Sequence, residues 1–465
     1  MWSTIEKVLV KGSTFFIGII LARLLSPSDY GLIGMLSIFI SLSTIFIESG
    51  FAKALIQKQD RTELDFSTTF LFNLGSAFII YGIFYAIAPW IASFYEAPQL
   101  SSLLRVLSLN IIIGSLNIVQ RAKLMIAMNF KTLAKVNFWG TLTGGVLGIY
   151  MAYQGYNVWA LVGQSISSTA TMAILFFYYT KWKPAFLFSL QSFKTLFGFG
   201  SKLLITGTIT TIFNNITIIA IGKLYKSNEL GFYTRASQFT EMIAWTINDV
   251  LGNVTFPVLS ELQKQRERMI EIYRKSLFYT SLVIFPIMIL LAVLAKPLVI
   301  VLLTEKWLPS VPLIQILCFA RMLTPLSAIN MNLLNAIGRS DLFMKADLSK
   351  LPIGLIILII TIPMGVKTIV IGNLISTIIC FFINTYYPQK IFGYGGIQQL
   401  KDSSKIFIAL IFMSVISHLS TLFFGSPIVK LIIGGFLGIT TYIIGCYTLK
   451  IISFKTIFAY RKKLD

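Results

Sequence analysis

Long apolar segments alternate with short polar turns along almost the whole chain of 465 residues. A helix needs about 17–25 mostly apolar residues to cross the hydrocarbon core of a bilayer. Because lipid offers the backbone no hydrogen-bond partner, such segments form helices. The pattern predicts about 14 membrane-spanning helices, near residues 3–24, 31–56, 66–92, 101–120, 134–153, 157–180, 193–221, 229–257, 273–303, 310–337, 346–364, 367–387, 404–424 and 427–450.

The composition agrees with this interpretation. Hydrophobic residues make up 56% of the chain and charged residues 12%, a balance that a soluble domain cannot bury. The net charge of +21 would suggest nucleic-acid binding in a soluble protein. In a membrane protein, lysine and arginine gather instead in the cytosolic loops. We therefore predict a chain embedded in the lipid bilayer, with no nucleic acid as a partner.

Basic residues are divided unequally between alternate loops, which predicts the orientation of the chain. The outer loops hold Lys226, Lys306 and Lys430. The basic, cytosolic set comprises Lys58, Arg61, Arg121, Lys123, Lys131, Lys181, Lys183, Lys264, Arg266, Arg268, Arg339, Lys345, Lys390, Lys401, Lys455, Arg461, Lys462 and Lys463. Both termini are predicted to be cytosolic, and every outer loop is short.

The turn between the first two spans has a counterpart 200 residues later. Along this offset Arg23 corresponds to Lys223, Leu24 to Leu224, Asp29 to Glu229 and Gly31 to Gly231. In both copies a basic residue ends one helix and a glycine lies at the start of the next. Pro27 makes residues 26–29 a turn, and Ser28 or Asp29 is expected to cap the following helix. We interpret the chain as two copies of a six-helix unit in parallel orientation, as in some transporters.

The repeat predicts four parts. They are an N-terminal six-helix lobe (1–181), a cytosolic linker between the lobes (182–192), a C-terminal six-helix lobe (193–388), and two additional helices with a basic cytosolic tail (389–465). The linker is polar and contains Pro184, so it is the natural hinge. The predicted fold class is an all-α integral membrane protein with two lobes related by a parallel repeat and two extra C-terminal helices.

Charged residues inside the spans are the candidates for function. A charge at the bilayer midplane costs about 2.5–3.5 kcal/mol, so it needs a partner, a water-filled cavity or a route to the surface. A hydrated cavity between the lobes that is lined by bases would attract an anionic head group. The candidate ligands of that group are Arg23, Arg105, Lys202, Arg235 and Arg321. The candidates for binding a coupling cation are Glu48, Asp249 and Glu241.

Structural roles for these residues remain open. Arg23 and Lys223 could snorkel to the outer interface. Arg105 and Arg321 could instead form structural ion pairs with the intramembrane acids Glu48, Glu241 or Asp249. Asparagines within the spans could simply bond between helices, and Gly-x-x-x-Gly pairs are more typical of packing contacts than of sites. These residues are Asn214, Asn215, Asn248 and Asn330, and Gly140, Gly144, Gly148, Gly434 and Gly438.

The sequence contains no catalytic set. The chain has a single histidine, His418, and its three cysteines are far apart, so neither a zinc site nor a disulfide framework is expected. No nucleotide-binding Gly-x-x-x-x-Gly-Lys-Ser/Thr motif is present. No paired aspartates on a cytosolic loop could hold magnesium for glycosyl transfer. We predict a protein that is not an enzyme and needs no metal or cofactor.

Several segments between residues 21 and 260 resemble one known family, and the likeness covers nearly the whole chain. They are Leu21-Ala22-Arg23-Leu24-Leu25-Ser26-Pro27-Ser28-Asp29-Tyr30-Gly31, Glu48-Ser49-Gly50-Phe51, Ala54-Leu55-Ile56-Gln57, Asn157-Val158-Trp159-Ala160-Leu161-Val162, Phe197-Gly198-Phe199-Gly200-Ser201 and Phe256-Pro257-Val258-Leu259-Ser260. The chain resembles the polysaccharide transporter (Wzx-type flippase) family of the multidrug/oligosaccharidyl-lipid/polysaccharide exporter superfamily.

The resemblance implies a flippase in the bacterial inner (cytoplasmic) membrane. Its cargo would be a polyprenyl-diphosphate-linked oligosaccharide, turned outward for polymerisation by the polysaccharide polymerase machinery. Two lobes would rock about a central cavity in alternating access, driven by exchange of a proton or a sodium ion. In this interpretation the bases named above would meet the diphosphate, and an intramembrane acid would bind the coupling ion.

Three alternatives remain. A lipid II-type flippase shares the 14-span plan, and the sequence separates it weakly. A multidrug or cation exporter on the same scaffold should have an acidic cavity, whereas the bases predominate here. A membrane glycan polymerase or ligase belongs to a different class and needs a large outer loop, which this pattern does not contain.

Overall fold

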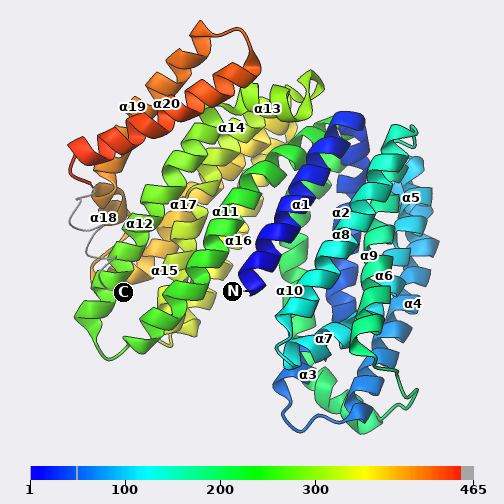
Figure 1. Cartoon of the computed structure of the whole chain (residues 1–465). Helices are drawn as coiled ribbons and strands as arrows, with labels where there is room; N and C mark the ends of the chain where they lie inside the picture. Colours follow the sequence, from blue (N-terminus) through cyan, green and yellow to red (C-terminus); the bar gives the residue numbers. More distant parts are fainter. Residues whose placement is uncertain (1, 49–50, 452–465) are drawn as a thin grey trace. The chain divides into compact units, whose positions relative to one another are not determined.

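The computed structural model describes residues 2–48 and 51–451, which form helices and no strand within those ranges (Figure 1). The helices are α1 (Trp2–Leu24), α2 (Pro27–Glu48), α3 (Phe51–Gln57), α4 (Glu63–Phe94), α5 (Gln99–Leu107), α6 (Leu109–Ser115), α7 (Ile118–Ile126), α8 (Phe130–Tyr153), α9 (Trp159–Thr180), α10 (Leu190–Leu224), α11 (Ser227–Glu261), α12 (Arg266–Val293), α13 (Ala295–Leu303), α14 (Ser310–Arg321), α15 (Thr324–Ala336), α16 (Ser340–Thr361), α17 (Val366–Phe392), α18 (Gly396–Asp402), α19 (Ser404–Phe423) and α20 (Pro427–Thr448). Short 3-10 turns occupy Glu305–Trp307 and Ile362–Met364.

Many of these helices are suited to a membrane. In the described part of the chain, 11 helical segments are long and apolar enough to cross a bilayer. The helices α1, α8 and α11, with 23, 24 and 35 residues, also reach that length but are not among the 11. The all-α integral membrane fold is therefore confirmed, and the number of 14 spans stays a prediction.

The helices form two compact units with a boundary between Gly231 and Phe232. The first unit includes α10, because this helix packs against α2, α3 and α4. The linker proposed at 182–192 therefore lies inside the first unit. The division into two repeated lobes, 1–181 and 193–388, stays a prediction.

The polar linker is fixed to the start of α4. The Trp182 indole N–H donates to Glu63 Oε2 over 2.7 Å, and Lys123 Nζ lies 2.7 Å from the other oxygen of the same carboxylate. The Ala185 N–H donates to Ser67 Oγ over 3.2 Å. These bonds satisfy backbone and side-chain groups of residues 182–189, which form no helix.

The turn of the repeated motif is closed by a capping box. Ser26 Oγ accepts from the Asp29 N–H at 3.3 Å, and Asp29 Oδ2 accepts from the Ser26 N–H at 2.8 Å. Pro27 occupies the first position of α2, where its missing N–H has no cost. The N-cap is therefore Ser26, and the prediction of Ser28 or Asp29 is wrong, because the cap must precede the proline that opens the helix.

The two copies of the motif touch each other within the first unit. A Cβ built on Gly31 would overlap the Ser227 carbonyl oxygen and lie 2.6 Å from its carbonyl carbon. A Cβ built on Gly231 would overlap the Pro27 carbonyl oxygen and lie 2.7 Å from its carbonyl carbon. Pro27 and Ser227 are related by the same offset of 200 residues as the two glycines. The contact is thus reciprocal, and it brings the starts of α2 and α11 to backbone contact.

In α8, the Gly-x-x-x-Gly residues are packing contacts, as predicted. A Cβ on Gly144 would lie 2.6 Å from the Gln164 carbonyl oxygen of α9, and one on Gly140 would lie 3.1 Å from the Ser168 carbonyl oxygen. The third glycine of the series, Gly148, faces Gln164 at 2.8 Å. Small residues allow the backbones of α8 and α9 to approach closely.

One intramembrane asparagine belongs to a buried polar network in the second unit. Asn330 Oδ1 accepts hydrogen bonds from the Tyr273 hydroxyl at 2.5 Å and from Gln399 Nε2 at 2.8 Å. Its own Nδ2 donates to the Leu326 carbonyl at 2.8 Å. The prediction that such asparagines bond between helices is confirmed for Asn330, which joins α15 to α12 and α18.

A proline in α12 is matched by a tyrosine of the last helix. Pro286 has no N–H to give to the carbonyl of Leu282, four residues earlier in the helix. The Tyr442 hydroxyl of α20 donates to that carbonyl over 2.8 Å. The bond satisfies the freed carbonyl and fixes α20, one of the two added helices, against α12.

Candidate functional site

The charged residues predicted for function are distributed over both units. Arg23 ends α1 and is exposed, and Arg105 lies near the end of α5. Arg235, Glu241 and Arg321 belong to the second unit, where Glu241 and Arg321 form an ion pair. The side chains of Lys202, Glu48 and Asp249 lie outside the described part of the structure.

An ion pair links α11 to α14 in the second unit. Arg321 Nη2 lies 2.7 Å from Glu241 Oε1, and the Ser237 hydroxyl donates to the same oxygen over 2.8 Å. The side chains of Arg321 and Glu241 are 20% and 39% exposed, so the pair is neither sealed nor fully solvated. Arg321 is the last residue of α14, where the segment breaks before α15 begins. The structural alternative that was open for Arg321, an ion pair with an intramembrane acid, is confirmed, and its partner is Glu241.

Arg235 lies on α11, six residues before Glu241. Its side chain is buried, with 6% of the residue exposed, and Nη1 donates to Gln238 Oε1 over 2.7 Å. The guanidinium carbon lies 5.9 Å from the ring centroids of both Phe239 and Trp307. These distances are at the outer edge of cation–π contact. The second unit therefore has Arg235 and Glu241 on α11 and Arg321 at the end of α14, and the last two form an ion pair.

Arg105 has a structural task that the sequence did not reveal. Pro89 interrupts α4 and leaves the carbonyl of Tyr85 without its helical donor. Arg105 Nε donates to this carbonyl over 3.2 Å, and its guanidinium carbon lies 4.3 Å from the centroid of the Tyr85 ring. No intramembrane acid is its partner in these contacts. Arg105 thus donates to the Tyr85 carbonyl the hydrogen bond that Pro89 cannot supply within α4.

We expect the stability cost of Arg105→Ala to depend on Pro89. In the wild-type background the variant leaves the Tyr85 carbonyl unpaired, at a cost of about 1–3 kcal/mol. In a Pro89→Ala background the new N–H of residue 89 takes that carbonyl, so Arg105→Ala should cost much less. Thermal unfolding of the four proteins in detergent measures this coupling. Pro388→Ala, in α17, is the control background, and a cost of Arg105→Ala that is equal in all backgrounds would contradict the assignment.

Lys223 corresponds to Arg23 in the second copy of the motif, and its side chain contacts the turn that follows α4. Lys223 Nζ lies 2.8 Å from Glu96 Oε1 and 5.3 Å from the Phe94 ring. The hydrogen bond from Lys223 holds the pKa of the Glu96 carboxyl below its usual range. A cation at the carboxyl end of α10 also interacts favourably with the helix dipole.

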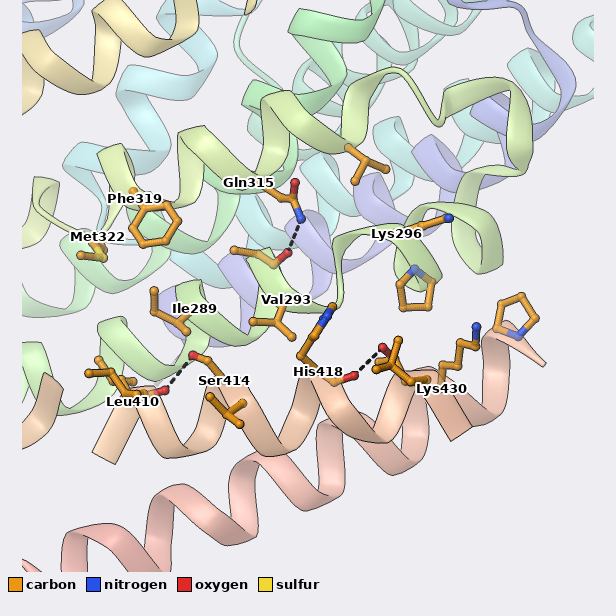
Figure 2. A pocket seen from close by; sticks show the side chains of 18 of the residues that line it. Ile289, Val293, Lys296, Gln315, Phe319, Met322, Leu410, Ser414, His418 and Lys430 are labelled. Carbon is orange, nitrogen blue, oxygen red and sulfur yellow. Dashed lines mark hydrogen bonds between the residues drawn. The ribbon is translucent and has the colours of Figure 1, made fainter. Parts of the chain in front are cut away.

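A groove of about 1040 Å³ lies in the second unit, between α12, α13 and α14 on one side and α19 and α20 on the other (Figure 2). Most of its lining is apolar, including Ile289, Val293 and Leu410. The side chains of Lys296 and Lys430 lie toward the same end of the groove in Figure 2. The groove therefore combines a long apolar wall with positive charge at one end.

His418 and Gln315 add polar groups along this groove. His418 projects from α19 between Val293 and Lys430, and Gln315 Nε2 donates to the Ala292 carbonyl over 3.1 Å (Figure 2). The hydropathy pattern could not reveal the groove, because the groove exists only where α19 and α20 pack against the other helices of the second unit.

The docking of α20 depends on two of its glycines. A Cβ on Gly434 would lie 2.9 Å from Leu294 Cδ2, and one on Gly438 would lie 2.8 Å from Leu290 Cδ1. Both are packing contacts, as predicted from their spacing. They bring α20 close to the α12–α13 junction, and α19 lies beside α20 in Figure 1.

Solved structures with this fold are membrane transporters. The structure of lipid II flippase MurJ in an inward closed conformation matches with a TM-score of 0.77 and 16% identity, over 100% of this chain and 99% of that one. A multidrug resistance MATE family transporter of the MOP superfamily, in an inward-facing conformation, matches with a TM-score of 0.62 and 16% identity, over 82% of this chain and 93% of that one. At these identities the likeness shows the fold alone.

The sequence has relatives in bacterial polysaccharide synthesis. Teichuronic acid biosynthesis protein TuaB of Bacillus subtilis (strain 168) is 30% identical over 301 residues, which are 64% of this chain and 62% of TuaB. Lipopolysaccharide biosynthesis protein WzxC of Escherichia coli (strain K12) is 23% identical over 390 residues, which are 82% of this chain and 79% of WzxC. Residues 20–312 match the family model described as polysaccharide biosynthesis protein, and the chain is a multi-pass membrane protein that belongs to this family.

Proposed function

We propose that this protein is a flippase that moves a polyprenyl-diphosphate-linked oligosaccharide across the bacterial cytoplasmic membrane for surface polysaccharide synthesis. Three facts support the proposal: the family, relatives named for the synthesis of teichuronic acid and lipopolysaccharide, and a fold shared with a lipid II flippase. The protein transports its cargo and forms no covalent bond. Its partners are the bilayer, the lipid-linked glycan, a proton or sodium ion, and polysaccharide polymerase machinery.

The groove is the observation that most strongly supports a lipid-linked cargo. A polyprenyl diphosphate is a long apolar chain with two phosphates at one end. The apolar wall of the groove suits the chain, and the ammonium groups of Lys296 and Lys430 suit the phosphates. With both termini cytosolic, the turn between α19 and α20 lies on the outer side. The lysines would then bind the diphosphate after it has crossed the membrane.

The ion pair in the second unit supplies a mechanism for coupling. While Arg321 is bound to Glu241, its charge is neutralised. A proton or sodium ion on Glu241 would release the guanidinium to bind a phosphate of the cargo, and loss of the ion would restore the pair. Each elementary charge moved across the membrane is worth about 2.3 kcal/mol per 100 mV, so one exchanged ion biases the cycle. Arg235 provides a further positive charge on the helix that carries Glu241.

Neutralising both groove lysines should impair export without unfolding the protein. We expect Lys296→Gln with Lys430→Gln to reduce surface polysaccharide roughly tenfold or more, because each charged hydrogen bond to phosphate contributes about 1.5–3 kcal/mol. The matched control is Lys367→Gln at the start of α17, which is exposed and lies outside the groove. The measurement is complementation of a strain that lacks the gene, with protein levels checked by immunoblot. Normal polysaccharide in the double variant would contradict the role of the groove.

A further inference from the structure

A second pocket, of about 330 Å³, lies within the first unit. It is lined from α2, α3, α6, α7, α8 and α9, and it surrounds the point where α6 ends and α7 begins. Its polar lining includes Asn110, Asn117, Arg121 and Asn137, and its apolar lining includes Met172 and Phe176. The volume is at the lower end of the range for small-molecule sites.

The break in the helix places polar groups in this pocket. The N–H groups of Leu116 and Asn117 bond to the carbonyls of Ile113 and Gly114, three residues back, at 3.3 and 3.0 Å. The tightened turn interrupts the α-helical ladder at Asn117. In transporters, substrate sites are typically formed by discontinuous helices of this kind.

Two asparagines that line the pocket have amide oxygens without donors. Asn110 Nδ2 donates to Ser165 Oγ over 3.0 Å, which fixes the orientation of the amide. The Oδ1 atoms of Asn110 and Asn117 are buried and accept no hydrogen bond from the described residues. A buried carbonyl without a donor is unfavourable, so the pocket is complementary to a ligand that donates hydrogen bonds.

The remaining lining narrows the class of ligand. Free phosphate offers few donors at neutral pH, and a bare cation is disfavoured because the described lining has an arginine and no carboxylate. A sugar ring donates from its hydroxyls and presents an apolar C–H face to Phe176 and Met172. Arg121 is exposed and lies one helical turn after Asn117, so it can bind a phosphate attached to that ring.

We propose that this pocket binds a glycosyl phosphate, namely the first sugar of the cargo together with the phosphate that joins it to the lipid. This inference rests on the proposed function, since it identifies the part of the cargo that is recognised. Asn110 and Asn117 accept bonds from the ring hydroxyls, and Arg121 binds the phosphate. With the predicted orientation, Arg121 lies on the cytosolic side, where the cargo is loaded.

The test uses purified full-length protein in lipid nanodiscs. Saturation-transfer NMR is recorded with glucose 1-phosphate, galactose 1-phosphate and N-acetylglucosamine 1-phosphate, each compared with inorganic phosphate and methyl α-glucoside. We expect saturation of the ring protons of at least one hexose 1-phosphate. That signal should fall at least fivefold when Asn110→Leu is combined with Asn117→Leu, and Arg121→Gln should weaken binding of the hexose phosphate to the level of the methyl glucoside.

Filling the pocket gives an independent variant that does not remove a polar group. A Cβ on Gly114 would meet only Thr169 Cγ2, at 4.0 Å, so Gly114→Leu fits without strain at its first atom and occupies the pocket. Gly82→Leu is the matched control, because a Cβ there meets nothing within 4 Å. Asn215→Leu is the control for the asparagines, because its Nδ2 bonds to Thr211 O in its own helix. Both controls should keep the signal.

The outcomes separate the pocket from the transport function. Absence of saturation with every hexose phosphate, or an unchanged signal in Gly114→Leu, would overturn the pocket assignment. If wild type and Gly114→Leu both export polysaccharide normally, the pocket assignment is also overturned, and the proposed function stays intact. Binding that depends on Asn110 and Asn117 in a protein that moves no lipid-linked glycan would leave the pocket in place and refute the flippase.

Discussion

Alanine at Gly31 or at Gly231 is expected to abolish stable folding, and to a similar degree at the two positions. In each case the new Cβ would occupy the place of a backbone carbonyl, that of Ser227 or of Pro27. A backbone carbonyl in the first turn of a helix cannot rotate away as a flexible side chain can. The cost should exceed the roughly 1–3 kcal/mol that is typical of overpacking. Fluorescence-detected size-exclusion chromatography and the unfolding temperature in detergent measure the effect.

Gly12→Ala is the control for this pair, because a Cβ at residue 12 meets nothing within 4 Å and alanine favours the helix. The reciprocal contact also predicts that the two alanines together are little worse than either alone, since one forced separation of α2 and α11 accommodates both. Variants Gly31→Ala and Gly231→Ala that elute and unfold as wild type does would show that the two motif copies are not in backbone contact.

Arg321→Ala is expected to have the largest effect on transport among the charged residues. The substitution leaves the Glu241 carboxylate without its cation, and removing one partner of a buried pair costs about 3–5 kcal/mol, less where the pair is partly exposed. Glu241→Ala added to Arg321→Ala removes the stranded charge and should restore much of the lost stability. The double variant should still fail to export polysaccharide, because the guanidinium that binds phosphate is absent.

This double variant separates a structural bridge from a functional one. Arg274→Ala is the matched control, since Arg274 pairs with Asp402 over 3.0 Å in the same unit, and both side chains are exposed. It should change export little, because exposed pairs contribute about 0–1 kcal/mol. Restored export in the variant that lacks both Arg321 and Glu241 would mean that the pair is only a brace between α11 and α14.

Patterns along the chain were sufficient for much of the fold. Apolar length identifies membrane helices because the bilayer sets a minimum number of residues. The offset of 200 residues identified Gly31 and Gly231, and their reciprocal contact gives that repeat a physical basis. The sequence pattern places the cap of α2 two or three residues too late, because the proline at the first position of the helix fixes the cap at Ser26.

The sites were less predictable, because they depend on which helices become neighbours. Pairing between Arg321 and Glu241 could be anticipated, since a charge in a membrane needs a partner. The bond from Arg105 to the Tyr85 carbonyl follows from Pro89. A proline inside a predicted helix leaves the carbonyl four residues earlier without a donor, so the sequence could have suggested an unpaired acceptor at Tyr85. Neither the groove nor the pocket at Asn117 leaves a signal in hydropathy.

The most direct test of the flippase is translocation by the purified protein in sealed proteoliposomes. The lipid-linked glycan of the host is reconstituted in both leaflets, and an impermeant glycosidase digests the glycan that is exposed outside. We predict that wild type renders the glycan of the inner leaflet digestible, faster under an imposed proton or sodium gradient, whereas Arg321→Ala leaves it protected. Glycan that stays protected with wild type, or lipid II that moves while the host glycan does not, would contradict the proposed function.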